Sequence, residues 1–227
     1  MISLNGKVVM ITGAMGGLGQ TVTGAFSQAG AKVMVVGREH PEKLPEGLLG
    51  LSADVTDEAE VQRLMKEAVQ KTTRLDCLIN LVGGFAMGRL AETDASLWSR
   101  MLSLNLTSAF LLSREATRLM VKQGFGRIIH MAARAAVDPF PGAGGYIVSK
   151  SGLLALIKVL ALELAGSGVK VNGVLPSTID TPANRQSMPA ADFTQWVKPE
   201  AIAALLVFLA SDEADALNGA LIPIGSS

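Results

Sequence analysis

A tyrosine and a lysine stand four residues apart in the segment Tyr146 to Lys150, which reads Tyr-Ile-Val-Ser-Lys. In a helix, side chains at positions i and i+4 point to the same side, so the phenol and the ammonium would be neighbours. An isolated tyrosine titrates at about 10 and is a poor proton donor at neutral pH, but a nearby positive charge lowers that pKa. The pair is therefore a candidate for general acid–base chemistry. Such pairs also occur by chance on many helices, so their surroundings decide what they mean.

A glycine-rich segment near the N-terminus has the element order that a dinucleotide-binding loop requires. Lys7 to Thr12 reads as a buried parallel strand, the segment Thr12-Gly-Ala-Met-Gly-Gly-Leu-Gly19 follows, and a helix to Ala29 comes next. The glycines permit a tight turn and let backbone N–H groups approach a pyrophosphate, which the positive end of the helix also favours. An ordinary glycine-rich turn is the alternative, and the element order argues against it. The residues predicted to bind the dinucleotide here are Thr12, Gly13, Met15, Gly17, Leu18 and Gly19.

The end of the second predicted strand, Lys32 to Val36, indicates which dinucleotide is preferred. A carboxylate at this place would bind the ribose 2′-hydroxyl of NAD, whereas the sequence has Gly37 and Arg38. A guanidinium suits the 2′-phosphate of NADP, so the sequence favours NADP(H) over NAD(H). A solvated surface arginine is the alternative interpretation of Arg38.

Two further strand ends are predicted to join the same site. A third strand, Leu48 to Ala53, is followed by a carboxylate that can accept from an adenine amino group or simply belong to a turn. A fourth strand, Cys77 to Asn80, runs into a second glycine-rich loop, Leu81 to Gly88. In an open parallel sheet, ligands bind at the carboxyl ends of the strands, so both segments belong to one site. The residues predicted to bind the dinucleotide here are Asp54, Val55, Asn80, Val82 and Gly83.

The remaining pattern predicts the elements that position these residues. Further strands are expected at 126–131, 170–175 and 220–224, and helices at 57–71, 95–122, 146–164 and 201–210. A chain of 227 residues with this pattern fits one α/β domain, residues 1–227. The segment from Pro176 to Trp196 is irregular, and we expect it to form a short substrate lid around residues 177–197.

Composition excludes several classes of protein. The 20 basic and 20 acidic residues balance, so no global field favours nucleic acid or an anionic membrane. The most apolar helical stretch, Leu153 to Leu164, contains two charged residues and is predicted to be too short to span a bilayer. The N-terminus lacks a signal-peptide pattern, Cys77 lies in an apolar stretch that favours a buried reduced thiol, and no cluster has metal-ligand spacing. We expect a cytoplasmic protein with no nucleic-acid or membrane partner and no metal.

Taken together, these motifs resemble the short-chain dehydrogenase/reductase family over essentially the whole chain. The resemblance implies a single-domain Rossmann fold, in which a doubly wound parallel sheet of seven strands in the order 3-2-1-4-5-6-7 is flanked by helices. It also implies an NAD(P)H-dependent oxidoreductase that acts on a small-molecule substrate. Apolar helices around Leu111 and Leu156 suggest a homodimer or homotetramer. The segments that carry the resemblance are Thr12 to Gly19, Asp54-Val55, Asn80 before Gly83, Asn105, Tyr146 with Lys150, and Pro176 to Thr181.

The resemblance also assigns roles. It implies that Tyr146 is the proton donor, that Lys150 bonds the nicotinamide ribose and that Asn105 holds a water molecule in the proton relay. Asn105 lies in the middle of a predicted helix, an uncommon place for a poor helix former, which independently suggests a hydrogen-bonding task. The resemblance places three further residues by the nicotinamide or its phosphates, namely Pro176, Ile179 and Thr181.

The fifth predicted strand departs from the family pattern. The family usually has a serine thirteen residues before the tyrosine, where this sequence has Ala133. Loss of one oxyanion-type donor costs about 10²–10³ in rate for an acyl-type reaction. A narrower resemblance accounts for the alanine. The run from Ala133 to Tyr146 and the segment from Leu175 to Trp196 are similar to the quinonoid dihydropteridine reductase branch, in which alanine occupies the same position.

Three functional hypotheses follow from these residues. The first is a reductase of a quinonoid dihydropterin-like or other conjugated substrate, with hydride supplied by NAD(P)H and a proton by Tyr146. The second is an ordinary carbonyl reductase or alcohol dehydrogenase with a 3-oxoacyl or sugar-like substrate. The third, motivated by Ala133, is a catalytically impaired nucleotide-binding scaffold or redox sensor.

Overall fold

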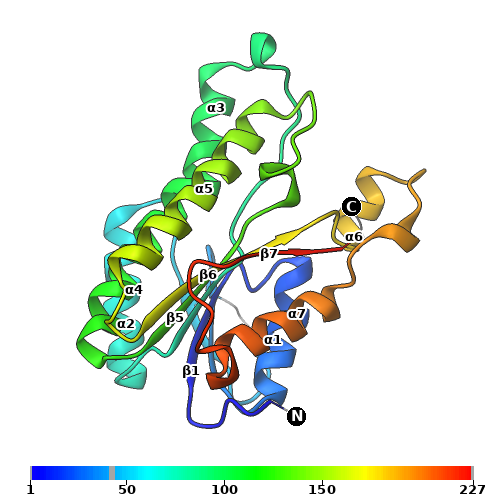
Figure 1. Ribbon diagram of the computed structural model, residues 1–227. Helices are drawn as coiled ribbons and strands as arrows, with labels where there is room; N and C mark the ends of the chain where they lie inside the picture. Colours follow the sequence, from blue (N-terminus) through cyan, green and yellow to red (C-terminus); the bar gives the residue numbers. More distant parts are fainter. Residues whose placement is uncertain (1, 41–43, 226–227) are drawn as a thin grey trace.

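Seven short strands pair in parallel and form one continuous sheet, in the order β3-β2-β1-β4-β5-β6-β7 (Figure 1). The computed structural model describes residues 2–40 and 44–225. The predicted single-domain Rossmann topology is confirmed, including the switch point between β1 and β4, where successive strands begin to be added in the opposite direction and where ligands bind in such sheets. The strands are β1 Val8–Thr12, β2 Lys32–Gly37, β3 Leu49–Ser52, β4 Cys77–Asn80, β5 Gly126–Met131, β6 Val169–Pro176 and β7 Leu221–Ile224.

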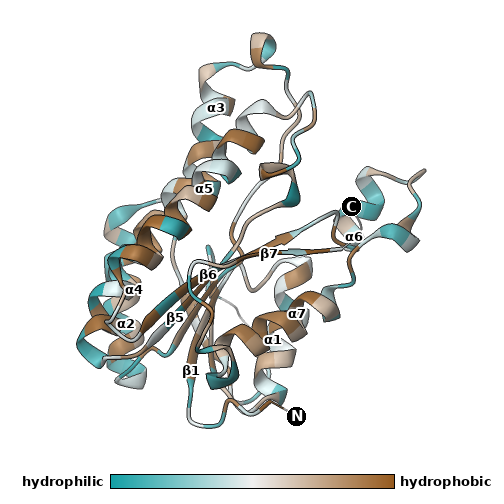
Figure 2. Cartoon of the chain, in the orientation of Figure 1, coloured by the Kyte–Doolittle hydropathy of each residue, from teal (hydrophilic) through white to brown (hydrophobic). Residues whose placement is uncertain are grey.

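The sheet is doubly wound, with helices on both faces (Figure 1). On one face, Phe26 of α1 and Leu206 of α7 pack in one apolar layer with β1 and β4. On the other face, Leu64 of α2, Leu112 of α4 and Ile157 of α5 form the second layer. Figure 2 shows hydrophobic residues concentrated along the strands between these layers, as expected for a sheet buried on both sides. The α-helices are α1 Gly17–Gln28, α2 Glu58–Thr72, α3 Ala95–Leu102, α4 Ser108–Gln123, α5 Gly144–Glu163, α6 Pro182–Ser187 and α7 Pro199–Ala210.

Short helical turns complete the described chain. Four of them are 3-10 turns, η1 Leu90–Glu92, η3 Arg134–Ala136, η4 Phe193–Gln195 and η5 Asp212–Ala214, and η2 Ser103–Thr107 is a π-turn.

The π-turn η2 interrupts what the sequence predicts as one helix over 95–122. It joins α3 to α4 and contains Asn105, which is buried. A single π-turn accommodates one extra residue in a helix and is frequent at functional sites. The predicted hydrogen-bonding task of Asn105 therefore coincides with a local change in the helix backbone.

The spacing of Asp57 and Glu60 in the sequence predicts a helix cap with reciprocal hydrogen bonds at the start of α2, and the structure differs from it in detail. The Asp57 carboxylate accepts from the Glu60 backbone N–H at 2.9 Å, as a helix cap should. The Glu60 carboxylate, however, accepts from the Asp54 backbone N–H at 2.8 Å and not from Asp57. The prediction of a closed capping box is therefore wrong. The bond that replaces it fixes the turn after β3, where Asp54 begins the predicted adenine site.

Helix α5 agrees closely with the predicted helix 146–164, and the apolar stretch predicted to be too short for a bilayer is part of this helix of 20 residues. By length and composition alone, this helix could cross a membrane. Core helices of globular domains pass the same test, and α5 packs against α3, the π-turn and β6. Cys77 is buried, as predicted, and burial raises the pKa of its thiol.

The predicted lid segment is more regular than its composition suggests. It contains α6 and η4, and a parallel bridge between Ile179 and Val197 closes its base. The Asp180 carboxylate accepts from Arg185 at 2.5 Å and 2.9 Å and from Lys198 at 2.7 Å, which ties the two ends of the segment together. These bonds lower the pKa of Asp180. The segment projects from the body of the domain beyond β6 (Figure 1), and its function as a lid stays a prediction.

Candidate active site

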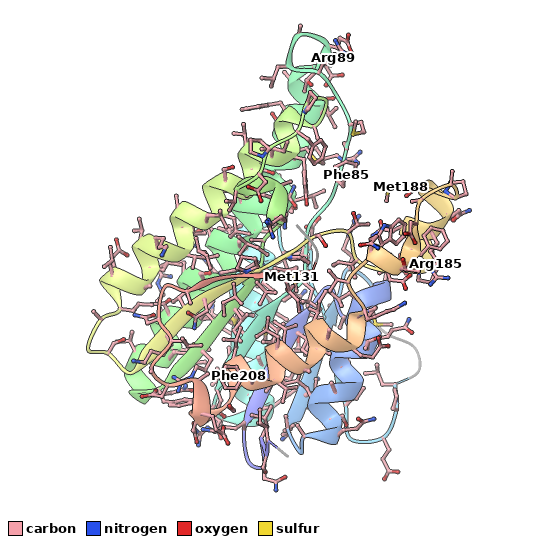
Figure 3. All side chains as sticks on the ribbon, turned by 45° about the vertical axis from the view of Figure 1, so that its right-hand side comes forward. Phe85, Arg89, Met131, Arg185, Met188 and Phe208 are labelled. Carbon is pink, nitrogen blue, oxygen red and sulfur yellow. The ribbon has the colours of Figure 1, made fainter. Side chains whose placement is uncertain are left out.

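Tyr146 and Lys150 lie on the first turns of α5, which places both side chains at the carboxyl end of β5. The Lys150 ammonium is 5% exposed and donates to the Met131 backbone carbonyl at 2.7 Å. Burial lowers the pKa of Lys150 to about 8. The half-buried Tyr146 meets the ring of Phe85 edge to face, with the ring centres 4.9 Å apart. Figure 3 shows Met131 inside the domain and Phe85 on the loop above it.

The protein alone does not produce the expected lowering of the phenol pKa. Burial raises the pKa of Tyr146 to about 12, and the Lys150 charge does not offset it. The phenol is therefore fully protonated at neutral pH, the state needed to donate a proton. Lowering this pKa requires a further positive charge close by, such as an oxidised nicotinamide ring.

Asn105 uses its side chain as a clamp. Its Nδ2 donates to the Gly84 carbonyl at 3.0 Å and to Ser149 Oγ at 3.1 Å, and its Oδ1 accepts from the Gly84 N–H at 3.0 Å. These bonds join the loop after β4 to α5. Since both N–H groups of the amide are engaged, a water molecule in a proton relay would bind to other atoms of Asn105, such as its backbone carbonyl within the π-turn. That role stays a prediction.

Ala133 ends the extended backbone after β5 and is buried. Its methyl group occupies the position at which the family pattern has a hydroxyl. The nearby Ser151 hydroxyl donates to the Ala136 carbonyl at 3.2 Å. Among the described residues, no other hydroxyl group takes the place of the serine that the family pattern has at position 133.

A cavity of about 390 Å³ lies at the carboxyl ends of β1, β2, β3 and β4. The structure brings seven of the predicted dinucleotide-binding residues together there, namely Gly13, Met15, Arg38, Asp54, Val55, Val82 and Gly83. The cavity is also lined by residues that the sequence did not single out, namely Gly16, Val36, Gly37, Ala53, Thr56, Leu81 and Leu104. Most of these adjoin a predicted residue, and Leu104 alone comes from the distant π-turn.

Two glycines of the first loop fit the tight backbone that a dinucleotide needs. Gly13 has a φ of +73°, and a Cβ there would lie 3.2 Å from the Leu81 and Val82 backbone. A Cβ on Gly19 would lie 2.4 Å from the Gly13 carbonyl oxygen, so no side chain fits between loop and helix. Both positions match the roles predicted from the glycine spacing.

The far end of the cavity combines opposite charges. The Asp54 carboxylate accepts from the Thr56 hydroxyl at 2.6 Å and the Thr56 N–H at 2.9 Å. These bonds, with a smaller effect of the exposed Arg38, lower the pKa of Asp54. Asp54 is therefore ionised and held by its turn, while Arg38 stands at the cavity wall, where a 2′-phosphate would meet it.

Several predicted binding residues lie behind or beside the cavity. Thr12 and Asn80 are buried under the loops and bond each other, Thr12 Oγ1 donating to Asn80 Oδ1 at 2.8 Å. Thr181 caps α6 by accepting from the Asn184 N–H, and it lies against the start of α1, since a Cβ on Gly17 would be 3.4 Å from its Cβ. The other predicted residues that do not line this cavity are Gly17, Leu18, Gly19, Lys150, Pro176 and Ile179.

Comparison with known proteins accounts for this arrangement. The short chain dehydrogenase family model matches residues 7–192. The chain belongs to this family. It is 31% identical to a 3-oxoacyl-[acyl-carrier-protein] reductase of Thermotoga maritima, with 97% of each chain covered. It is 32% identical to D-threitol dehydrogenase of Mycolicibacterium smegmatis, covering 96% of this chain and 90% of that protein.

Solved structures of two reductases have the same fold as this chain. A short-chain type dehydrogenase/reductase from Mycobacterium ulcerans superposes with a TM-score of 0.91 at 27% identity, covering 98% of this chain and 90% of the other. A 3-ketoacyl-(acyl-carrier-protein) reductase from Brucella melitensis, complexed with NADH, gives a TM-score of 0.88 at 26% identity, with 98% of each chain covered. The chain is thus an oxidoreductase of the short-chain dehydrogenase family, which binds NAD(P)(H). The narrower likeness to dihydropteridine reductase stays a prediction.

The buried Lys150 should give the apoprotein a distinctive pH dependence. Because burial lowers the pKa of Lys150 from 10.5 to about 8, the unfolded chain binds more protons at this group between those values. The contribution of Lys150 to the free energy of unfolding therefore rises with pH across that window. We expect wild type to gain stability relative to Lys150→Met between about pH 8 and about pH 10 in urea unfolding. A constant or shrinking difference would contradict the buried position.

Proposed function

We propose that this protein is an NADP(H)-dependent reductase of a small-molecule carbonyl compound, with Tyr146 as the proton donor. The observation that carries the proposal is the protonated, half-buried phenol of Tyr146 beside an ammonium fixed on Met131. The names of the relatives, which include 3-oxoacyl reductases and diol or polyol dehydrogenases, support a carbonyl–alcohol interconversion.

Each residue has a separate role in the proposed reaction. NADP(H), when bound, supplies or accepts the hydride. Tyr146 holds its proton at neutral pH and donates it to the carbonyl oxygen as charge develops there. Lys150 is held rigidly by Met131, where it can bond a ribose and stabilise the phenolate that proton donation leaves. Phe85 covers one side of Tyr146 and limits access of water.

Ala133 means that Tyr146 orients and protonates the substrate without a serine at the usual position. A carbonyl substrate activated by conjugation or by a neighbouring electron-withdrawing group needs less help from a second donor. We therefore infer an activated carbonyl compound, such as a 3-oxoacyl derivative, as the substrate. We also propose a cytoplasmic homodimer or homotetramer, an assembly supported by exposed apolar residues on α4 and α5, namely Phe110, Val121, Val148, Val159 and Leu162.

The first test is turnover by purified protein. We expect NADPH oxidation, followed at 340 nm, with a 3-oxoacyl thioester, and a loss of about 10²–10⁴-fold in kcat/KM in Tyr146→Phe because the proton donor is removed. The NADPH Kd should change little, since the phenol is not required to hold the dinucleotide. Tight NADPH binding without turnover of any acceptor would favour the nucleotide-binding scaffold. Turnover that survives Tyr146→Phe unchanged would exclude the assigned role.

A quinonoid dihydropterin is the second candidate substrate, favoured by Ala133. Hydride adds there to a conjugated, imine-like system, for which protonation by Tyr146 can suffice. We expect Ala133→Ser to raise kcat/KM for a simple ketone by about 10-fold or more, because it restores an oxyanion-type donor, and to leave pterin reduction nearly unchanged. Equal effects of Ala133→Ser on ketone and pterin reduction would contradict the expected difference between the two substrates. Ala133→Cys is the matched control, because it adds a similar volume without a hydroxyl.

Cofactor preference tests the position of Arg38. We expect Arg38→Asp to weaken NADPH binding by about 10-fold or more, since a guanidinium contact with a dianionic phosphate is replaced by repulsion. NADH binding should hold or improve, because the new carboxylate can accept from a 2′-hydroxyl. Isothermal titration with both dinucleotides measures the ratio, and Arg89→Asp, on the distant loop before η1, is the control. An unchanged ratio would make Arg38 a surface residue only.

A further inference from the structure

Three polar side chains stand side by side inside the sheet, on adjacent strands. Thr12 of β1 is in register with Asn80 of β4, and Asn80 is in register with His130 of β5. All three are buried, and so is Ser113, which reaches them from α4. The polar row lies directly under the two loops that wall the dinucleotide cavity.

Hydrogen bonds connect these four side chains in one chain. Asn80 Oδ1 accepts from Thr12 Oγ1 at 2.8 Å and from the Val82 backbone N–H at 3.1 Å. Asn80 Nδ2 lies 3.3 Å from His130 Nδ1, and His130 Nε2 lies 2.8 Å from Ser113 Oγ.

Donor and acceptor rules allow one arrangement of protons. The Val82 N–H can only donate, so Asn80 must present its oxygen to Val82 and its NH₂ to His130. His130 Nδ1 must then be the unprotonated acceptor, and the single ring proton lies on Nε2 and is donated to Ser113. A second proton, on Nδ1, would face the Asn80 NH₂ group. Burial and, secondarily, the charge of Lys150 lower the pKa of His130 to about 3, in agreement with a neutral ring.

We propose that His130 is a positioning residue of the dinucleotide site, which fixes the orientation of Asn80 and thereby the loop that contains Val82 and Gly83. Both loop residues line the cavity. Gly83 also packs closely on the catalytic groups, since a Cβ there would lie 2.8 Å from Asn105 Oδ1 and 3.1 Å from Lys150 Nζ. Rotation of the Asn80 amide would withdraw the acceptor from Val82 and move this loop.

The inference rests on the proposed function only in requiring that the protein binds NADPH, and binding is measured without substrate. We expect His130→Leu, which removes the acceptor for Asn80, to raise the NADPH Kd at least 10-fold at a temperature well below its unfolding midpoint. His130→Gln offers an amide oxygen to Asn80 and an NH₂ to Ser113, and it should restore the Kd to within about threefold of wild type. Leu112→Ala, a buried change on the same helix as Ser113, is the control for general destabilisation.

An NADPH Kd unchanged in His130→Leu, or raised no more than in Leu112→Ala, would overturn the inference. Failure of wild type to bind NADPH or NADH would overturn the proposed function and this inference with it. If His130→Leu does not fold, Ser113→Ala keeps the ring in place and frees its tautomer, and the Kd should rise at least threefold. An unchanged Kd in that variant would also overturn the inference.

Nitrogen NMR gives a readout that a merely space-filling histidine would not show. The sequence contains two histidines, so His40→Gln leaves His130 as the only imidazole signal. We expect the neutral Nε2–H tautomer from pH 5 to pH 8, with and without NADPH. A Nδ1–H tautomer, a mixture of the two, or protonation within that range would overturn the assigned hydrogen bonds.

Discussion

The buried ammonium of Lys150 is the constraint on which the site depends. A charged amine inside a protein must have hydrogen-bond partners, because its desolvation is otherwise very costly. The Met131 carbonyl at the end of β5 provides one such partner, at 2.7 Å. This bond holds α5 at the carboxyl end of β5. Tyr146 lies one helical turn before Lys150 on the same helix. The Asn105 clamp, the close packing of Gly83 and the polar row ending at His130 all meet around the same strand end.

The remaining groups divide between two ends of one site. At the predicted adenine end, Arg38 and Asp54 provide the charged groups of the cavity. The close backbone packing at Gly13 and Gly19 determines the shape of the first loop. At the end near α5, burial raises the pKa of Tyr146 to about 12. In the proposed reaction, Tyr146 keeps its proton at neutral pH until charge develops on the substrate oxygen.

The sequence was sufficient for the parts of the fold that depend on local pattern. Strands β4 and β5 have the predicted bounds, 77–80 and 126–131, and the loop glycines could be predicted from their spacing because few other residues fit. Leu104, Ser113 and the partner of Glu60 could not be predicted, because each depends on which distant elements lie side by side. His130 is a buried histidine with a hydrogen-bond partner for each ring nitrogen. Its connection to Asn80 became visible only once the strand register was known.

The π-turn between α3 and α4 has a consequence for how this chain can vary. The π-turn Ser103–Thr107 takes up one extra residue by widening a single turn, so α3 and α4 keep nearly the relative orientation of a continuous α-helix. On one side of the π-turn, Met101 and Trp98 of α3 pack against Gly145 on α5. Helix α4 is held on the opposite side by the sheet. The π-turn therefore lets this helix pair differ by one residue in length at Asn105 while both helices keep their packing partners.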